Sequence, residues 1–126
     1  MNGLHILAEL HDCRGSRRLL CDVTALAALC RQACRDAGLE VVAEAFHQFP
    51  EAGATGAIVL AESHLAIHTW PELDAVTLDL YVCNHSRDNR DAAEAAYGAL
   101  AAAFQPGRCT RRDVERGAVA LVTTVD

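Results

Sequence analysis

The sequence predicts an α+β fold: a two-layer sandwich in which a mainly antiparallel sheet carries two helices on one face. Two segments alternate apolar and other residues with the period of two that a half-buried strand requires. Two further segments repeat apolar residues at helical spacing. The elements follow one another in the order β-α-β-β-β-α-β, with room for one more strand.

The first half of the chain predicts two strands around one helix. Residues 3–11, GLHILAELH, alternate as a strand does, with one face formed by Leu4, Ile6, Ala8 and Leu10. Residues 22–37 have helical spacing, with Asp22 as the N-cap and Gly38 as the stop signal. Residues 39–49, LEVVAEAFHQF, predict the second strand.

The middle of the chain predicts a turn-rich loop followed by an extended run. Residues 50–56, PEAGATG, have loop composition. Residues 57–63, AIVLAES, read as a buried strand. We expect residues 64–70, HLAIHTW, to continue extended until Pro71 ends the strand.

The last part predicts a strand, a helix and a final strand. Residues 75–83, AVTLDLYVC, alternate again, with an inward stripe of Val76, Leu78, Leu80 and Val82. Residues 88–104 form an Ala-rich amphipathic helix, and residues 117–125 are a candidate last strand. Because helices cover one face of the sheet only, the other face needs a partner, so we expect a homodimer.

Composition indicates one soluble domain spanning residues 1–126, since 52% of the residues are hydrophobic and 22% charged. The net charge of −6 disfavours nucleic-acid binding. A basic cluster is interrupted by Asp113 and Glu115, which predicts a solvated strand or loop face; it comprises Arg108, Arg111, Arg112 and Arg116. No apolar run is long enough to span a bilayer and no secretory signal is evident, so we expect a cytoplasmic protein without membrane contact.

Six cysteines are present, and none forms a CxxC pair. In a cytoplasmic protein the default state of such thiols is reduced. Cys30 and Cys34 lie four apart on the first predicted helix, where we expect them to pack in the core.

The segment AESHLAIHTWPE, residues 61–72, concentrates two histidines, a serine, two carboxylates and the only tryptophan. His64 and His68 are four apart, a spacing that brings two imidazoles together on a helix. The alternation predicts a strand instead, on which the rings lie roughly 13 Å apart. That separation is too long for one ion, so we expect no metal site.

Nucleophilic chemistry has two forms here. Ser63 lacks a GxSxG elbow, and nothing local marks Cys83 and His68 as a nucleophile pair, which disfavours ordinary hydrolysis. Alternatively, the Ser63 hydroxyl adds to the carbonyl of Glu62, and the resulting ester breaks by elimination once a base removes the Cα proton. General rules for nucleophiles and bases allow this self-cleavage without singling it out.

The pattern FHQF, GATGAIVLAESHLAIHTWPE and LDLYVC closely resembles the prokaryotic pyruvoyl-dependent S-adenosylmethionine decarboxylase family. The resemblance covers roughly residues 4–117. It implies autocatalytic cleavage between Glu62 and Ser63 into a β chain of residues 1–62 and an α chain of residues 63–126. It further implies a pyruvoyl group made from Ser63, which forms a Schiff base with the substrate during loss of CO₂ and requires no metal. The product then donates aminopropyl groups for spermidine synthesis.

The resemblance also implies roles for individual side chains. His68 is the base in processing, Cys83 protonates the product carbon, and Thr55 assists where relatives usually have serine. The substrate S-adenosylmethionine is surrounded by Phe49, Leu65, His68, Trp70 and Glu72. Within this set the rings of Phe49 and His68 sandwich the adenine and Glu72 accepts hydrogen bonds from the ribose. The family places this site at or near the dimer interface.

Two departures from the family pattern keep alternatives open. The segment after Trp70 reads WPELDAVT where relatives have WPEYGYAA, and Asn84 replaces a glycine after Cys83. The added carboxylate of Asp74 suits a cationic amino acid, so decarboxylation of ornithine or arginine is the alternative activity. An alternative of another class is a dimeric binding module that does not process itself.

Overall fold

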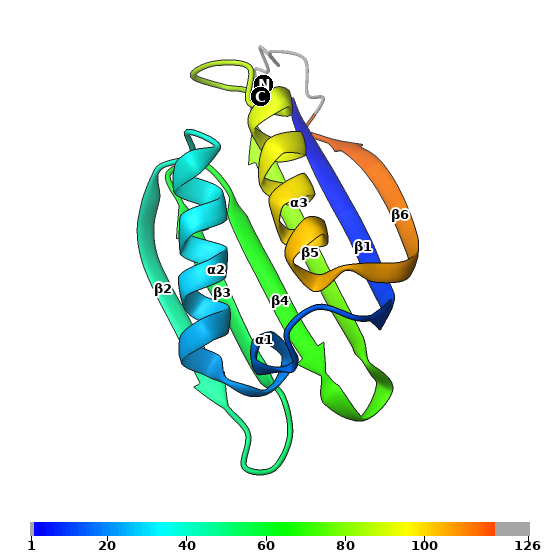
Figure 1. Ribbon diagram of the computed structural model, residues 1–126. Helices are drawn as coiled ribbons and strands as arrows, with labels where there is room; N and C mark the ends of the chain where they lie inside the picture. Colours follow the sequence, from blue (N-terminus) through cyan, green and yellow to red (C-terminus); the bar gives the residue numbers. More distant parts are fainter. Residues whose placement is uncertain (1, 118–126) are drawn as a thin grey trace, which may run out of the picture.

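The protein folds into one six-stranded antiparallel sheet with the strand order β2-β3-β4-β5-β1-β6 (Figure 1). The computed structural model describes residues 2–117. The strands are β1 Gly3–Cys13, β2 Val41–Gln48, β3 Ala54–Leu60, β4 His64–Trp70, β5 Ala75–Cys83 and β6 Pro106–Arg116. β1, the first strand in the sequence, therefore lies between the last two strands, β5 and β6, in the sheet.

Two long helices cover one face of this sheet, which confirms the predicted fold class (Figure 1). The helices are α1 Arg17–Cys21, α2 Val23–Asp36 and α3 Arg90–Phe104, and a single 3₁₀ turn, η1, covers Pro71–Leu73. α2 packs on β2 and β3, and α3 packs on β5 and β1. None of the helices in residues 2–117 has the length and apolarity that a membrane crossing requires.

The core lies between the helices and the inner face of the sheet. The predicted inward stripe of β5 is confirmed, because Val76, Leu80 and Val82 are fully buried and Leu78 is 4% exposed. Cys30 and Cys34 are also fully buried, as predicted, and none of the six cysteines is paired. Burial raises the pKa of both thiols, that of Cys34 to about 11, which keeps them protonated and inert at neutral pH.

The predicted ends of α2 are confirmed. The Asp22 side chain accepts a hydrogen bond of 2.8 Å from the backbone N–H of Thr24, as an N-cap does. After the helix, Gly38 adopts a φ of +86°, a conformation that a residue with a Cβ rarely takes. This turn directs the chain into β2 at the edge of the sheet.

The prediction of one extended run over residues 57–70 was wrong. This segment contains a turn that joins β3 and β4 into a hairpin. The two strands reverse at Ala61 and Glu62, closed by the Leu60 N–H donating to the Ser63 carbonyl at 2.9 Å and a reciprocal bond of 3.4 Å. Neither residue of this turn is a glycine or asparagine, so the sequence lacks the usual signal for a two-residue reversal. The reversal places the predicted cleavage bond in a turn.

Two further elements extend the predicted order. α1 is a single short helix that periodicity does not reveal, and β6 turns the basic cluster of residues 108–116 into an edge strand, in line with its predicted solvation. The candidate strand over residues 117–125 lies, from residue 118 on, outside the described residues.

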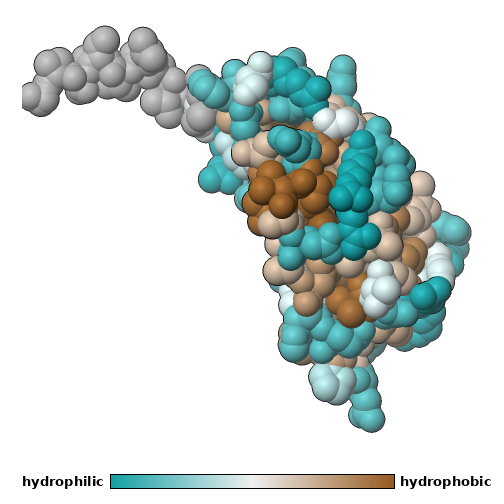
Figure 2. Space-filling view, turned by 90° about the vertical axis from the view of Figure 1, so that its left-hand side faces the viewer, coloured by the Kyte–Doolittle hydropathy of each residue, from teal (hydrophilic) through white to brown (hydrophobic). Residues whose placement is uncertain are grey.

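The outer face of the sheet is covered by no helix in the described structure. Exposed apolar side chains at outer-face positions are Leu7, Val59 and Val114, which are 39–45% exposed. Figure 2, which faces the β2 side of the molecule, shows apolar side chains gathered on this side. Val42 of β2 is 61% exposed. Surfaces of this kind mark interaction sites.

Candidate active site

Apart from Leu65, the predicted site residues on β3, β4 and β5 share the outer face of the sheet. Their strand register places Thr55 opposite His68 and His68 opposite Thr77. One hydrogen-bonded contact follows directly: Thr55 Oγ1 lies 2.5 Å from His68 Nδ1. A hydroxyl bound to Nδ1 orients the ring and leaves Nε2 available for proton transfer.

A cavity of about 510 Å³ lies beside this pair at one end of β4. It is lined by five of the predicted residues, namely Phe49, Thr55, His68, Trp70 and Glu72. Phe49 is 45% and Trp70 43% exposed, unusually high values for large aromatic side chains that pack in a core. A cavity with exposed aromatic rings, an imidazole and one carboxylate suits a flat heterocycle joined to a hydroxylated sugar.

Two buried features hold this cavity in place. The Thr69 hydroxyl, 5% exposed, accepts from the Ala54 N–H at 2.9 Å and donates to the Leu20 carbonyl at 2.8 Å. The loop that carries Phe49 approaches so closely that a Cβ on Gly53 would lie 2.1 Å from the Thr69 carbonyl oxygen. β3, β4 and α1 are therefore locked together beneath the cavity.

Leu65 differs from the other predicted substrate residues. Its side chain is fully buried and points into the helix-covered core. Only the backbone of Leu65 is available to a ligand on the outer face, because side chains of a strand alternate between faces.

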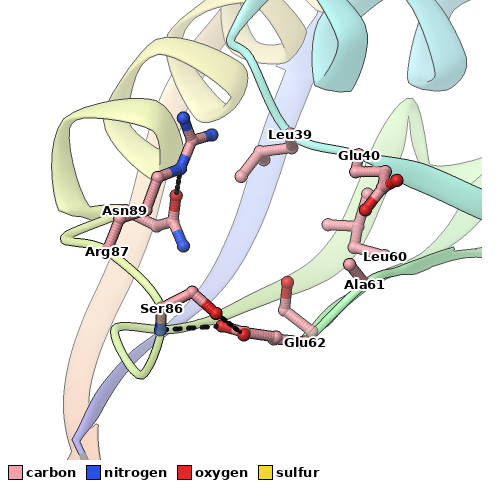
Figure 3. A pocket seen from close by; sticks show the side chains of 9 residues that line it. Leu39, Glu40, Leu60, Ala61, Glu62, Ser86, Arg87 and Asn89 are labelled. Carbon is pink, nitrogen blue, oxygen red and sulfur yellow. Dashed lines mark hydrogen bonds between the residues drawn. The ribbon is translucent and has the colours of Figure 1, made fainter.

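Glu62 and Ser63 lie at the opposite end of β4, in the turn after β3. They line a second pocket, of about 340 Å³, between the chain entering β2 and the loop after β5 (Figure 3). The pocket residues contributed by those two segments are Leu39, Glu40, Ser86, Arg87 and Asn89. The predicted cleavage bond is thus accessible.

Cys83 ends β5 at the same end of the sheet as Ser63. It pairs with Gly3 of β1, is 5% exposed, and its carbonyl accepts a hydrogen bond of 2.9 Å from the Asn89 side chain. Its neighbours along the outer face are Tyr81 and Asp79, as the strand parity predicted.

The predicted residues therefore form two groups. Ser63 and Cys83 lie at one end of β4, and His68 and Thr55 at the other. Four residues, 64–67, lie between Ser63 and His68, and five steps at the rise of a strand correspond to roughly 16 Å. A base must approach its proton to within hydrogen-bond distance or one water molecule. The His68 and Ser63 of one chain cannot meet.

A cluster between the two groups was not predicted. Asp79 Oδ2 accepts hydrogen bonds from His5 Nε2 at 2.8 Å and His64 Nε2 at 2.9 Å, although these residues lie on three different strands. Burial opposes ionisation of Asp79, but the two imidazole hydrogen bonds outweigh it and lower the pKa of this carboxyl. No local pattern signals the cluster, because strand pairing alone brings His5 beside β5.

The three side chains have potential metal-ligand atoms within 4.8 Å of one another. However, His5 Nδ1 lies 3.1 Å from Nη1 of Arg116, which can only donate. His5 therefore carries its proton on Nε2, where an ion would need a lone pair. The arrangement is a hydrogen-bonded cluster, and the expected absence of a metal stays a prediction.

Asp74, the added carboxylate after Trp70, is paired within the chain. Its Oδ1 accepts from Arg17 Nη1 at 2.7 Å, and Arg17 Nη2 also donates to the Pro71 carbonyl at 3.0 Å. Since the charge of Asp74 already has a guanidinium partner, it does not favour a cationic amino acid as the substrate.

Comparison with known proteins identifies the family of this chain. The family model described as S-adenosylmethionine decarboxylase matches residues 4–117. An S-adenosylmethionine decarboxylase proenzyme of Carboxydothermus hydrogenoformans is 36% identical over 112 residues, 89% of this chain and 87% of that protein. One from Acidithiobacillus ferrooxidans is 35% identical over 120 residues, 95% of this chain and 86% of that protein.

The fold comparison leads to the same family. The crystal structure of the adenosylmethionine decarboxylase from Aquifex aeolicus superimposes with a TM-score of 0.85 at 32% identity. The match covers 98% of this chain and 97% of that one. The chain described here belongs to the S-adenosylmethionine decarboxylase family.

Proposed function

We propose that this protein cleaves itself between Glu62 and Ser63 and decarboxylates S-adenosylmethionine. The observation that carries the proposal is the cavity lined by Phe49, His68, Trp70 and Glu72, whose rings and carboxylate match an adenine and a ribose. The product is decarboxylated S-adenosylmethionine, a sulfonium compound that donates aminopropyl groups for spermidine synthesis.

Ser63 fits the formation of a pyruvoyl group. Its hydroxyl oxygen adds to the Glu62 carbonyl carbon, and the amide nitrogen leaves that carbon and takes a proton. β-Elimination then removes the Ser63 Cα proton and breaks the Cβ–O bond, which releases the new C-terminal α-carboxylate of residue 62. The dehydroalanine left at position 63 takes a proton at Cβ to become an imine, and water replaces ammonia at its Cα. Because β4 begins at His64, the new chain end stays fixed to the sheet.

The pyruvoyl carbonyl supplies the electron sink for loss of CO₂. The chain's own residues do the rest. Phe49, Trp70 and Glu72 bind and orient the nucleoside, and Cys83 returns a proton to the carbon that has lost CO₂. His68, held by Thr55, removes the proton during processing.

The 16 Å gap between Ser63 and His68 is closed by a second copy of the chain. Contacts in a two-fold dimer are reciprocal, so a dimer in which the His68 end of one sheet meets the Ser63 end of its partner also contains the reverse contact. The helix-free face with Leu7, Val59 and Val114 provides the apolar contact surface. Two complete sites result.

Purified wild-type protein is expected to run as two fragments, residues 1–62 and 63–126, on a denaturing gel. The Ser63→Ala variant is expected to remain one chain and to release no CO₂, because the attacking hydroxyl is gone. Intact-mass measurement checks the fragment ends, and CO₂ release from S-adenosylmethionine, ornithine and arginine checks the substrate. An intact wild-type chain contradicts the proposal, and release from ornithine or arginine alone contradicts the substrate.

A further inference from the structure

The loop between β5 and α3, residues 84–89, reaches the turn that carries the cleavage bond. Ser86 of this loop contacts the carboxylate of Glu62 with two donors: its hydroxyl bonds Oε1, and its backbone N–H lies 3.5 Å from Oε2 (Figure 3). The hydrogen bond from the Ser86 hydroxyl is the main reason why the pKa of the Glu62 carboxyl is lowered. The contact therefore involves the charged carboxylate at neutral pH.

The other end of the loop is firmly attached. Asn89 is 9% exposed, and its side-chain amide donates to the Cys83 carbonyl at 2.9 Å. The Asn89 N–H donates to Asn84 Oδ1 at 2.8 Å, and the Asn84 N–H donates to the Asn2 carbonyl at 2.7 Å. One short loop thus links Glu62 to the strand of the proton donor.

Within residues 2–117, Ser86 is the residue that hydrogen-bonds the Glu62 side chain, because the charged groups nearby bond other partners. The Arg87 guanidinium bonds the Gly38 carbonyl and, at 2.9 Å, Asn89 Oδ1. Glu40 lines the same pocket, and its backbone carbonyl accepts from the Ala61 N–H at 3.1 Å. Without Ser86, the Glu62 side chain has no described hydrogen bond.

Resting on the proposed self-cleavage, we propose that Ser86 is a positioning residue for that reaction. Ser86 holds the Glu62 side chain and so restricts the motion of Glu62, whose backbone carbonyl is attacked. The carbonyl carbon therefore stays near the Ser63 hydroxyl. The reaction requires the Ser63 oxygen to approach the Glu62 carbonyl carbon. Holding the two atoms close together raises the rate of cleavage. Ser86 itself contacts none of the reacting atoms.

The test follows the cleavage of newly made chains over time, after a short pulse of cell-free synthesis, on denaturing gels. Ser86→Ala is expected to cleave about tenfold more slowly, the effect of losing one hydrogen bond to a charged group. Ser86→Thr keeps the hydroxyl and is expected to cleave near the wild-type rate. Ser16→Ala is the matched control, since Ser16 is an exposed serine that makes no capping hydrogen bond.

Two results overturn the positioning role. One is cleavage of Ser86→Ala within twofold of wild type. The other is slow cleavage together with a lowered melting temperature that Ser86→Thr does not restore, which is the behaviour of a residue that merely supports the fold. Failure of the wild type to cleave contradicts the proposed function instead, so the two failures are distinguishable.

Discussion

At the scale of single residues, the two histidines on the outer face of β4 differ in their hydrogen-bond partners. His64 and His68 are four apart on β4, yet each has a different companion: Asp79 at 2.9 Å for His64 and Thr55 at 2.5 Å for His68. The separation predicted from strand geometry explains why they do not act together. His64 anchors the strand immediately after the proposed cleavage bond, and His68 lines the cavity at the other end of β4.

Asp79→Asn is expected to lower the free energy of unfolding by about 1 kcal/mol at pH 7, because the charged acceptor of two imidazole hydrogen bonds is lost. The folded protein lowers the pKa of Asp79 below its ordinary value of 3.8. Its contribution is therefore complete above about pH 4 and disappears as the pH falls through the lower, folded value. Urea unfolding at a series of pH values measures the difference from wild type.

Glu9→Gln is the matched control for this prediction. Glu9 also pairs with a histidine on the outer face, at 3.1 Å from His11, but its side chain is 56% exposed. An exposed pair of this kind contributes little, so a change below about 0.5 kcal/mol is expected. A loss for Asp79→Asn that persists unchanged at pH 2 contradicts the linkage.

At the scale of elements, the β3–β4 hairpin organises the site. Its turn carries Glu62 and Ser63, and its open end carries Thr55, His68 and Trp70. The hydrophobic pattern correctly predicts which side chains face outward, since a period of two survives the reversal. The reversal itself was missed because Ala61 and Glu62 are uncommon in tight turns.

Thr69→Val is expected to lower the free energy of unfolding by about 1–3 kcal/mol. The substitution keeps the shape but leaves the Ala54 N–H and the Leu20 carbonyl buried without their partner. Chemical denaturation measures the change. Thr110→Val, at an exposed position of β6, serves as the control and is expected to change stability by less than about 0.5 kcal/mol.

At the scale of the whole molecule, the separation of Ser63 and His68 predicts complementation between chains. Ser63→Ala and His68→Ala chains are each expected to remain uncleaved when expressed alone. Co-expressed with tags of different size, they form mixed dimers in which the intact Ser63 of one chain meets the intact His68 of the other.

The chain that carries His68→Ala is therefore the one expected to be cleaved in the mixture, while the Ser63→Ala chain stays whole. Mass spectrometry of the tagged fragments identifies which chain was cut. Absence of cleavage in mixed dimers, isolated through both tags, contradicts a site shared between chains.

The sequence by itself determined the fold class, the outward and inward faces of the strands, the caps of α2 and the family. These properties depend on local periodicity and on a contiguous motif, which are present in the order of residues. It also identified five residues that line one cavity at the end of β4, through resemblance and not through spacing.

Only the tertiary structure decided how these residues are grouped. Tertiary packing brings His5 to Asp79, Arg17 to Asp74 and Ser86 to Glu62, contacts between residues that are 24 to 74 positions apart. It also separates Ser63 from His68, which lie close in sequence, because an extended strand rises about 3.3 Å per residue. Nearness in the sequence and nearness in space differ most in a sheet, and the candidate site of this protein depends on that difference.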